Sequence, residues 1–296
     1  MSQGGTEQLT KCDGYSTVRA FDVEYFHRKT SGNGDLWLTK EAWPWRELVA
    51  PERWYRNGEY TKHGVRLGFS TGHVYRMTEV DGRKRLSFVV KTSRVAQLVS
   101  SSGLLGRRQD TRGTFPSPFE EMGQLSRLRS SGADRLYLFT KRPLGIFSPG
   151  QRIPSWMLDR VAYEFSMAAA RASSDAARYQ PEEGMALEPE RDYFTLFAWV
   201  NGFNLEELVR MGRISIGEMR DIDAEVRERM LALGFFVADH KPNHVIVRLD
   251  QHGAPRRRHG KLVAALADFE LLESKVEGTP AGNSALVGSS EPERAA

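Results

Sequence analysis

One stretch decides how this sequence is interpreted: residues 234–247 read GFFVADHKPNHVIV. Before it, residues 216–233 predict an amphipathic helix, because apolar residues recur there every three or four positions. After it, apolar runs at 245–249 and 262–267 predict the two strands of a hairpin, and the second run leads into Ala-Asp-Phe-Glu. One loop and one strand end therefore carry four candidate functional side chains: Asp239, Lys241, His244 and Asp268.

This string resembles the catalytic loop of the protein-kinase-like superfamily. In that superfamily a helix delivers an Asp, a Lys-Pro and a metal ligand follow, and a hairpin presents a second Asp before a Phe. Phosphoryl transfer needs a carboxylate beside the attacking hydroxyl, a cation on the transferred group and ligands for one or two Mg²⁺ ions. The resemblance implies that Asp239 is the base and that Lys241 stabilises charge on the γ-phosphoryl group. It also implies that His244 and Asp268 bind Mg²⁺, with Mn²⁺ as an alternative.

Three positions depart from the usual pattern of that family. His244 stands where most members have Asn, and lipopolysaccharide-heptose kinases are similar to this chain in having His there. A neutral imidazole can coordinate a divalent metal, although it suits transition metals better than Mg²⁺. Val237-Ala238 replaces the usual His-Arg, so the arginine that would receive an activation-loop phosphate is missing. Glu270 replaces the Gly after Asp-Phe, as in aminoglycoside and choline kinases.

Residues 65–94 predict three antiparallel strands, because apolar segments alternate with turns and Asp81-Gly82 is a strong hairpin signal. In the resemblance, the first turn covers the nucleotide's phosphates and contains Gly72 and Val74. Lys91, on the third strand, would hold the α and β phosphates. The first two glycines of the family are absent from this turn, so its backbone amides would approach the phosphates less closely.

Residues 118–130 predict the next helix, because Ser117 is a suitable N-cap and Pro118 suits the first helical position. The resemblance implies that Glu121 pairs with Lys91, and Glu120 is the neighbour that could take this role. Acidic residues in a first helical turn also interact favourably with the helix dipole, and this alternative stays open.

Residues 193–208 resemble the last strand of a kinase N-terminal lobe, the hinge and the start of the next helix. Phe197 would guard the rear of the nucleotide pocket, and backbone groups of Ala198, Trp199 and Val200 would meet the adenine edge. Any buried strand followed by a capped helix would produce the same pattern, so a purely structural role is the alternative.

Four further segments carry weaker signals. Residues 18–27 predict a strand, and the four tryptophans between positions 37 and 54 predict aromatic packing, with ligand stacking as the lesser alternative. Residues 135–139 predict another strand. Residues 143–190 are an insertion relative to the family pattern, with a helix expected at 155–178.

Composition restricts the class of protein. The hydrophobic share of 40% and the charged share of 27% are those of a globular protein, and no apolar run predicts a transmembrane helix. Cys12 is the only cysteine and no secretory signal is visible, so we expect a cytoplasmic protein without disulfides or membrane contacts. The net charge is +4, and residues 256–259 (Arg-Arg-Arg-His) are expected at a hairpin tip. We interpret this cluster as a solvated turn, with a phosphate or nucleic-acid contact as the alternative; a nucleic-acid partner is not expected without interleaved aromatic residues.

The sequence thus predicts an α+β protein with a two-lobed protein-kinase-like fold, made of an N-terminal antiparallel sheet and a reduced helical C-terminal lobe. We expect a disordered tail at 1–16, an N-terminal lobe at 17–200, a C-terminal lobe at 201–273 and a disordered tail at 274–296. The resemblance implies an atypical kinase that transfers phosphoryl groups from ATP. Because no Ala-Pro-Glu follows Asp268, the acceptor would be a small hydroxylated molecule or the chain itself. The alternative is a pseudokinase that senses nucleotide or binds a protein partner.

Overall fold

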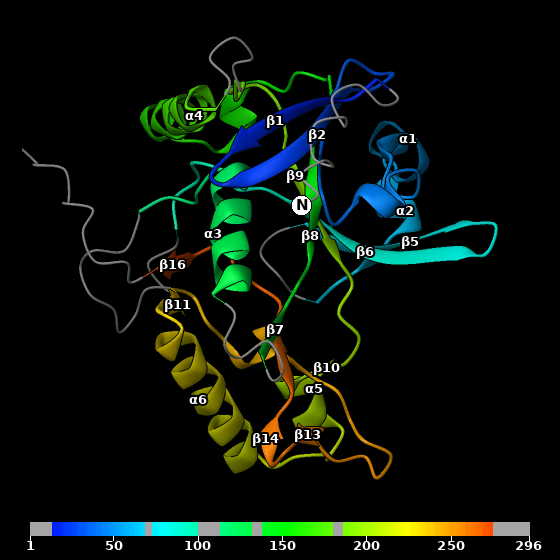
Figure 1. Ribbon diagram of the computed structural model, residues 1–296, viewed down its shortest axis with the longest axis vertical. Coiled ribbons are helices and arrows are strands. Elements are labelled where there is room, and N and C mark those ends of the chain that lie inside the picture. Colours follow the sequence, from blue (N-terminus) through cyan, green and yellow to red (C-terminus); the bar gives the residue numbers. More distant parts are fainter. Residues whose placement is uncertain (1–13, 69–72, 100–112, 132–137, 180–185, 275–296) are drawn as a thin grey trace, which may run out of the picture.

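A large antiparallel sheet dominates the fold (Figure 1). The computed structural model describes residues 14–68, 73–99, 113–131, 138–179 and 186–274. Within these residues the large sheet has eight strands, and each runs antiparallel to its neighbours. In spatial order they are β1 (Ser16–Ala20), β2 (Val23–Lys29), β3 (Asp35–Thr39), β8 (Pro143–Ser148), β9 (Phe194–Ala198), β6 (Lys84–Thr92), β5 (Val74–Asp81) and β4 (Val65–Arg66). The three strands predicted between residues 65 and 94 are confirmed as β4, β5 and β6.

One face of the sheet is covered by the aromatic segment between β3 and β4. This segment forms η1 (Trp43–Trp45), α1 (Pro51–Trp54), η2 (Arg56–Gly58) and α2 (Tyr60–His63). Trp54 is 1% exposed, and its ring meets the rings of Phe88 and Phe147 edge-on at centroid distances of 6.2 and 5.6 Å. Its indole N–H donates to the carbonyl of Val49 at 3.0 Å, which satisfies its one polar group. The packing role predicted for the tryptophan-rich segment is confirmed.

The opposite face is covered by α3 (Pro118–Ser130), which has the bounds predicted from the sequence. Ser117 and Glu120 form a capping box: the Ser117 Oγ accepts from the Glu120 amide at 3.2 Å, and the Glu120 carboxylate accepts from the Ser117 amide at 2.8 Å. The buried ring of Phe119 then meets Tyr25 and Trp37 of the sheet edge-on. Next to α3, α4 (Ala162–Ala177) packs beside β1 (Figure 1).

The remaining elements lie beside the lower part of α3 and below it in Figure 1. They are α5 (Leu205–Arg210), α6 (Ile216–Ala232), η5 (Pro242–His244), a sheet of β10 (Phe203–Asn204), β12 (Val245–Val247), β15 (Ala264–Leu266) and β7 (Leu138–Thr140), and two ribbons, β11 (Phe235–Val237) with β16 (Leu272–Ser274) and β13 (Arg257–Arg258) with β14 (Lys261–Leu262). The predicted helix at 216–233 and the hairpin after it are confirmed as α6 and the pair β12–β15. The fold is mixed α+β with one large antiparallel sheet and few helices. Among the described residues, no helix is both long and apolar enough to cross a membrane.

The structure differs from the sequence-based prediction in four places. Residues 18–27 belong to a hairpin, because the chain reverses at Phe21 and Asp22, where φ is 49° and 63°. Residues 143–190, expected as an insertion, contain the central strand β8, whose residues are all buried and therefore show no alternating pattern. The helix expected at 155–178 is broken by Asp159, with φ 51°, into η4 (Ser155–Leu158) and α4. Ser274, expected in the tail, pairs with Phe235 across β16 and β11.

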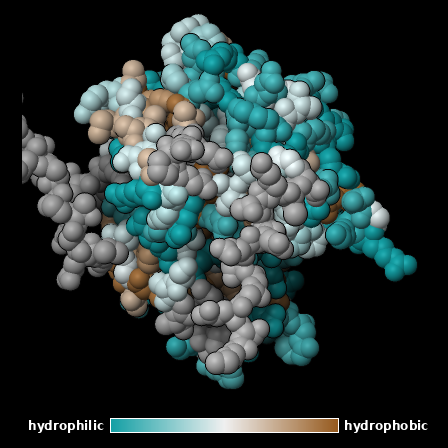
Figure 2. Space-filling model, turned by 45° about the horizontal axis from the view of Figure 1, so that its top comes forward, coloured by the Kyte–Doolittle hydropathy of each residue, from teal (hydrophilic) through white to brown (hydrophobic). Residues whose placement is uncertain are grey.

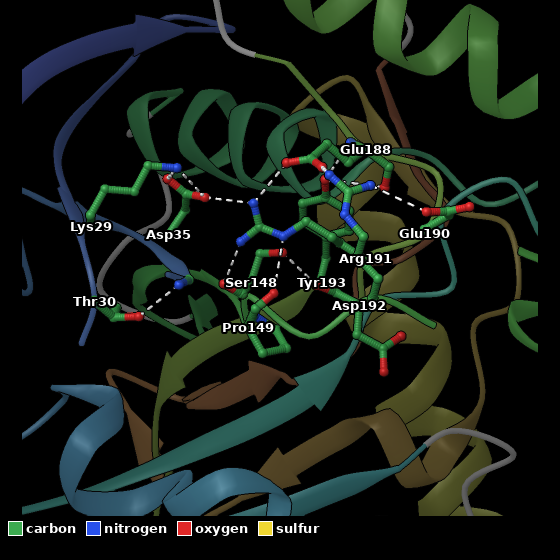
Figure 3. A network of polar contacts seen from close by, with 12 residues as sticks. Lys29, Thr30, Asp35, Ser148, Pro149, Glu188, Glu190, Arg191, Asp192 and Tyr193 are labelled. Atoms are coloured by element: carbon green, nitrogen blue, oxygen red, sulfur yellow. Dashed lines mark hydrogen bonds and ion pairs between the residues drawn. The ribbon is translucent and has the colours of Figure 1, made fainter. Parts of the chain in front are cut away.

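A buried ion-pair network fixes the segment before β9 to the sheet (Figure 3). Arg191 Nη1 lies 2.6 Å from the Asp35 carboxylate of β3, and its Nη2 and Nε donate to the carbonyls of Ser148 and Pro149 at 2.8 and 3.0 Å. Burial alone would raise the pKa of Asp35, but hydrogen bonds from His27, Lys29 and Arg191 outweigh burial and lower it. The network holds β3, β8 and the entry to β9 together.

The face shown in Figure 2 is largely hydrophilic, with an apolar area over α4 at the upper left. The exposed apolar side chains of η4 and α4 are Trp156, Met157, Tyr163 and Met167. Their exposed fractions range from 40% for Met167 to 79% for Trp156.

Candidate active site

The loop at residues 238–244 is fixed at both ends against the segment that follows β15. At its start, the Ala238 amide donates to the Leu271 carbonyl at 2.8 Å. At its end, the Ala267 amide donates to the His244 carbonyl at 2.9 Å. In between, the His240 imidazole bonds the Asp223 carboxylate of α6 at 2.7 Å, so the helix also anchors the loop. These contacts bring the loop and the strand end into one site, as the sequence predicts.

Lys91 is the central cation of this site. Its Nζ donates to Asp268 Oδ1 at 2.7 Å and lies 3.2 Å from Glu270 Oε1, although both carboxylates are remote from β6 in the chain. The Lys91 and Glu270 side chains are 8% and 5% exposed, and Glu270 also contacts the Arg94 guanidinium. The sequence did not indicate that Lys91 pairs with Asp268 and Glu270, or that Glu270 also pairs with Arg94.

The charges of this cluster stabilise one another. Burial alone would lower the pKa of Lys91, but the carboxylates of Asp268 and Glu270 outweigh burial and raise it. For Asp268, burial acts to raise the pKa, and the nearby Lys91 ammonium holds it well below the ordinary aspartate range. Lys91 is therefore charged and Asp268 ionised at neutral pH.

Asp239 and His244 face this cluster with unused polar atoms. Asp239 Oδ1 and His244 Nδ1 are buried and have no hydrogen-bond partner among the described residues. Burial, and then the Asp268 carboxylate, raise the pKa of Asp239, whereas burial lowers the pKa of His244. His244 Nε2 lies 3.7 Å from Asp268 Oδ2. Unsatisfied buried polar atoms are rare and call for an explanation such as a ligand, an ion or water.

The predicted ion pair between Lys91 and Glu121 is not formed in this structure, although the Glu121 carboxylate also acts to raise the pKa of Lys91. Glu121 Oε1 lies 3.2 Å from Lys141 Nζ instead, and both side chains are buried. Glu120 cannot replace it, because its carboxylate caps α3 and pairs with Arg171 at 2.8 Å. The physical reason is that Glu270 enters from the end of β15 and occupies the position beside Lys91, while Glu121 meets a second buried lysine.

Lys141 is a residue that the sequence did not single out. Its Nζ lies 3.5 Å from the centre of the Phe197 ring and 5.6 Å from that of Phe269. Burial lowers the pKa of Lys141, and the Glu121 carboxylate opposes that shift only partly. A lone lysine before a strand carries no sequence signal, so only the folded arrangement identifies it.

The predicted hinge segment lies where β9 leaves the large sheet. Phe197 is fully buried, and the amides of Ala198 and Trp199 donate to the carbonyls of Arg142 and Ser87 at 2.9 and 3.0 Å. Those two amides are therefore not free to meet a ligand. In the described part of the chain, the amide of Val200 has no backbone partner.

The positions of three other predicted site residues say less about their predicted roles. Val74 pairs with Lys91 across β5 and β6, so the two side chains share one face of the sheet. Gly72 lies outside the described residues. Lys241 is exposed, and none of the described carboxylates lies within ion-pair distance of it.

The side chains of this site suit a cation that is shared with the phosphates of a substrate better than a metal ion enclosed by protein ligands. Among the described residues, no three His, Cys, Asp or Glu side chains are grouped as a metal site. Mg²⁺ bound with substrate phosphates needs only one or two protein carboxylates, because phosphates and water supply the remaining oxygens. Asp268 and His244, with the unused Nδ1 of His244, fit such a partial ligand set.

Comparison with known proteins gives limited similarity. No protein-family model matches the sequence, and no curated protein matches it. Among solved structures, the chain is similar to a crystal structure of Rad53 residues 1–466 in complex with AMP-PNP, with a TM-score of 0.32 and 11% sequence identity. The match covers 87% of this chain and 60% of that chain, which is less than two thirds of its length. At this TM-score the site has to be judged on its own geometry.

Proposed function

We propose that the protein is an atypical kinase that transfers a phosphoryl group from ATP, with a divalent cation, to a hydroxyl group. One observation carries the proposal: Lys91 of β6, Asp239 and His244 of the loop, and Asp268 after β15 converge on one buried cluster. Phosphoryl transfer depends mainly on positioning and on electrostatic stabilisation, and this cluster offers the necessary charges. The large sheet, with helices and a smaller sheet at the other end of the molecule, supports the two-lobed kinase-like arrangement that we propose.

Each residue has a defined task in this proposal. Lys91 binds the α and β phosphates. When it does so, it gives up the contact with one carboxylate and contacts phosphate oxygens instead. Asp268 and His244 hold the cation, which shields the negative charge of the phosphates when it is bound. Asp239 accepts the proton of the attacking hydroxyl group through its unused Oδ1. The acceptor oxygen forms a bond to the γ-phosphorus as the bond to the β,γ-bridging oxygen breaks, and ADP leaves.

Glu270 orients Lys91 in this site. The resemblance assigns that task to Glu121, but Glu121 is bonded to Lys141. Glu270 contacts both Lys91 and Arg94, is nearly fully buried and lies two residues after Asp268. One short segment therefore supplies both the proposed metal ligand and the carboxylate that positions the lysine.

The proposed acceptor is a small hydroxylated molecule or the chain itself. After Glu270 the chain enters β16 at once, and β16 pairs with β11. These residues are used in pairing, so they do not offer an extended peptide a surface beside Asp239. This supports a small acceptor over a foreign protein substrate.

A pseudokinase that binds a nucleotide or a protein partner is the second candidate. It is favoured by the two carboxylates on Lys91, since phosphates have to compete with them, and by the exposed position of Lys241.

Incubation with labelled ATP and Mg²⁺ or Mn²⁺, alone and with a cell extract, separates the two functions. The kinase proposal expects label in small molecules or in the chain, reduced by orders of magnitude in Asp239→Asn. Labelling that Asp239→Asn retains in full contradicts the proposed base. ATP binding without any transfer supports the pseudokinase.

A further inference from the structure

A small pocket lies beside the hinge, on the hairpin formed by β12 and β15. Its volume is about 180 Å³. Its apolar floor includes Phe139, Ile246 and Ala265, and its rim carries Arg248, Arg256 and Arg258. The arginine cluster expected at a solvated hairpin tip therefore contributes two residues to a concave site.

Strand register explains the apolar floor. Ile246 of β12 is paired with Ala265 of β15, and Ala265 is paired with Phe139 of β7. Cross-strand partners project from the same face of a sheet, so these three side chains form one continuous strip. The Phe139 side chain remains 47% exposed, which leaves apolar surface open to a ligand.

Strand alternation explains which arginines reach the rim. Arg256 and Arg258 are two positions apart and share a face with Val263, which also lines the pocket. Arg257 lies between them and is paired with the core residue Leu262, so it projects from the other face. Its Nη1 donates to the Gly260 carbonyl at 3.1 Å.

No acid in the described part of the chain pairs with the arginines of the rim. Arg248 Nε donates to the Asn201 carbonyl at 3.1 Å, and no carboxylate among the described residues lies within ion-pair distance of Arg248, Arg256 or Arg258. Asp250, the acid within this hairpin, instead accepts from the amides of His252 and Ala254 at 2.8 and 3.0 Å. Guanidinium groups stay charged at all physiological pH values and bind phosphate oxygens in pairs.

We propose that this pocket binds a small phosphate ester whose other end is a flat apolar ring. The arginines would bind the phosphate, and the strip of Phe139, Ile246 and Ala265 would bury the ring. The volume is below the range of about 300–1,000 Å³ that is usual for drug-sized ligands, which limits the ligand to one ring and its phosphate. A nucleic-acid strand is a poorer fit, since it needs an extended basic groove with several stacking aromatic residues. The site does not depend on the proposed kinase function.

Calorimetric titration with phenyl phosphate, inorganic phosphate and phenol tests the proposal. We expect phenyl phosphate to bind more tightly than either of its two parts. The double variant Arg256→Gln/Arg258→Gln should weaken its binding by about tenfold or more, which corresponds to at least about 1.4 kcal/mol. Arg257→Gln, the matched control from the same strand, should leave binding within about twofold. All these positions are exposed, so the variants should keep the fold of the parent, which circular dichroism checks.

Two results would overturn the proposal. In the first, Arg257→Gln weakens phenyl phosphate as much as the double variant does, so the charge of the hairpin acts without a pocket. In the second, a short single-stranded oligonucleotide binds while phenyl phosphate does not, and the basic hairpin is then a nucleic-acid contact.

Discussion

Two buried lysines at the candidate active site differ in the balance of their surroundings. Lys91 faces two carboxylates, which raise its pKa in spite of burial. Lys141 faces Glu121 and the ring of Phe197, and burial dominates, so its pKa falls. The same side-chain type thus serves as a permanent cation in one position and as a group that releases its proton more readily in the other.

The variant Glu270→Gln tests the partner of Lys91. Removing this buried carboxylate leaves Asp268 as the ion-pair partner of Lys91 and removes one ion pair of Arg94. We expect the free energy of unfolding to fall by about 1–3 kcal/mol, less than for a fully broken buried pair because Asp268 remains. Urea denaturation measures it, with Glu206→Gln on the exposed side of α5 as the control. Equal stability of Glu270→Gln and the parent would mean that Glu270 does not hold Lys91.

The loss of stability caused by Glu121→Gln should depend on pH, because Glu121 pairs with the titratable Lys141. The pKa of Lys141 in the folded protein is below the ordinary lysine value. At pH values between the folded and the unfolded pKa, the unfolded chain therefore binds one proton more, and the stability of the fold rises with pH. Without Glu121 the folded pKa falls further, because an attraction that raises it is lost. The loss of stability should therefore be larger at about pH 7 than at about pH 10. Thermal denaturation of parent and variant at both pH values checks this, and a loss that grows with pH contradicts it.

Single elements were predictable where local chemistry determines them. Ser117, Pro118 and Glu120 mark the start of α3 through its capping box, so its bounds follow from the sequence. By contrast, β8 is buried on both faces and gives no alternation, and its neighbours β3 and β9 are remote in sequence. Its place in the sheet depends on long-range pairing, which a local pattern does not contain.

Arg191 should contribute more to stability than any other single side chain that joins β3, β8 and the entry to β9. Arg191→Met leaves Asp35 buried with fewer donors and frees the carbonyls of Ser148 and Pro149. We expect a loss of about 3–5 kcal/mol in the free energy of unfolding, as for other broken buried pairs. Arg152→Met removes ion pairs with Glu188 and Glu190. Because the Arg152 side chain is 63% exposed, the loss should be only about 0–1 kcal/mol. Urea denaturation of both variants measures the two losses. Similar losses would show that burial of the Arg191 network contributes little to stability.

The sequence predicted which segments of the molecule meet at the candidate active site, but it did not predict which charged side chains pair there. Asp239, His244 and Asp268 lie within one loop and one adjacent strand end, so their proximity follows from local order. The partner of Lys91 depends on how α3 and the end of β15 sit against the large sheet, a balance of many contacts. That is why Glu270 and Lys141 emerged only from the fold.

Calorimetric titration of ATP measures whether the cluster around Lys91 is a nucleotide site. We expect the parent to bind ATP more tightly with Mg²⁺ or Mn²⁺ than without. Lys91→Met should weaken binding by about tenfold or more, since it removes the cation on the phosphates, and Asp268→Asn should abolish the effect of the metal. Thermal denaturation without ATP confirms that both variants are folded. Equal ATP affinity in the parent and in both folded variants, with or without the metal, would mean that this cluster is not a nucleotide site.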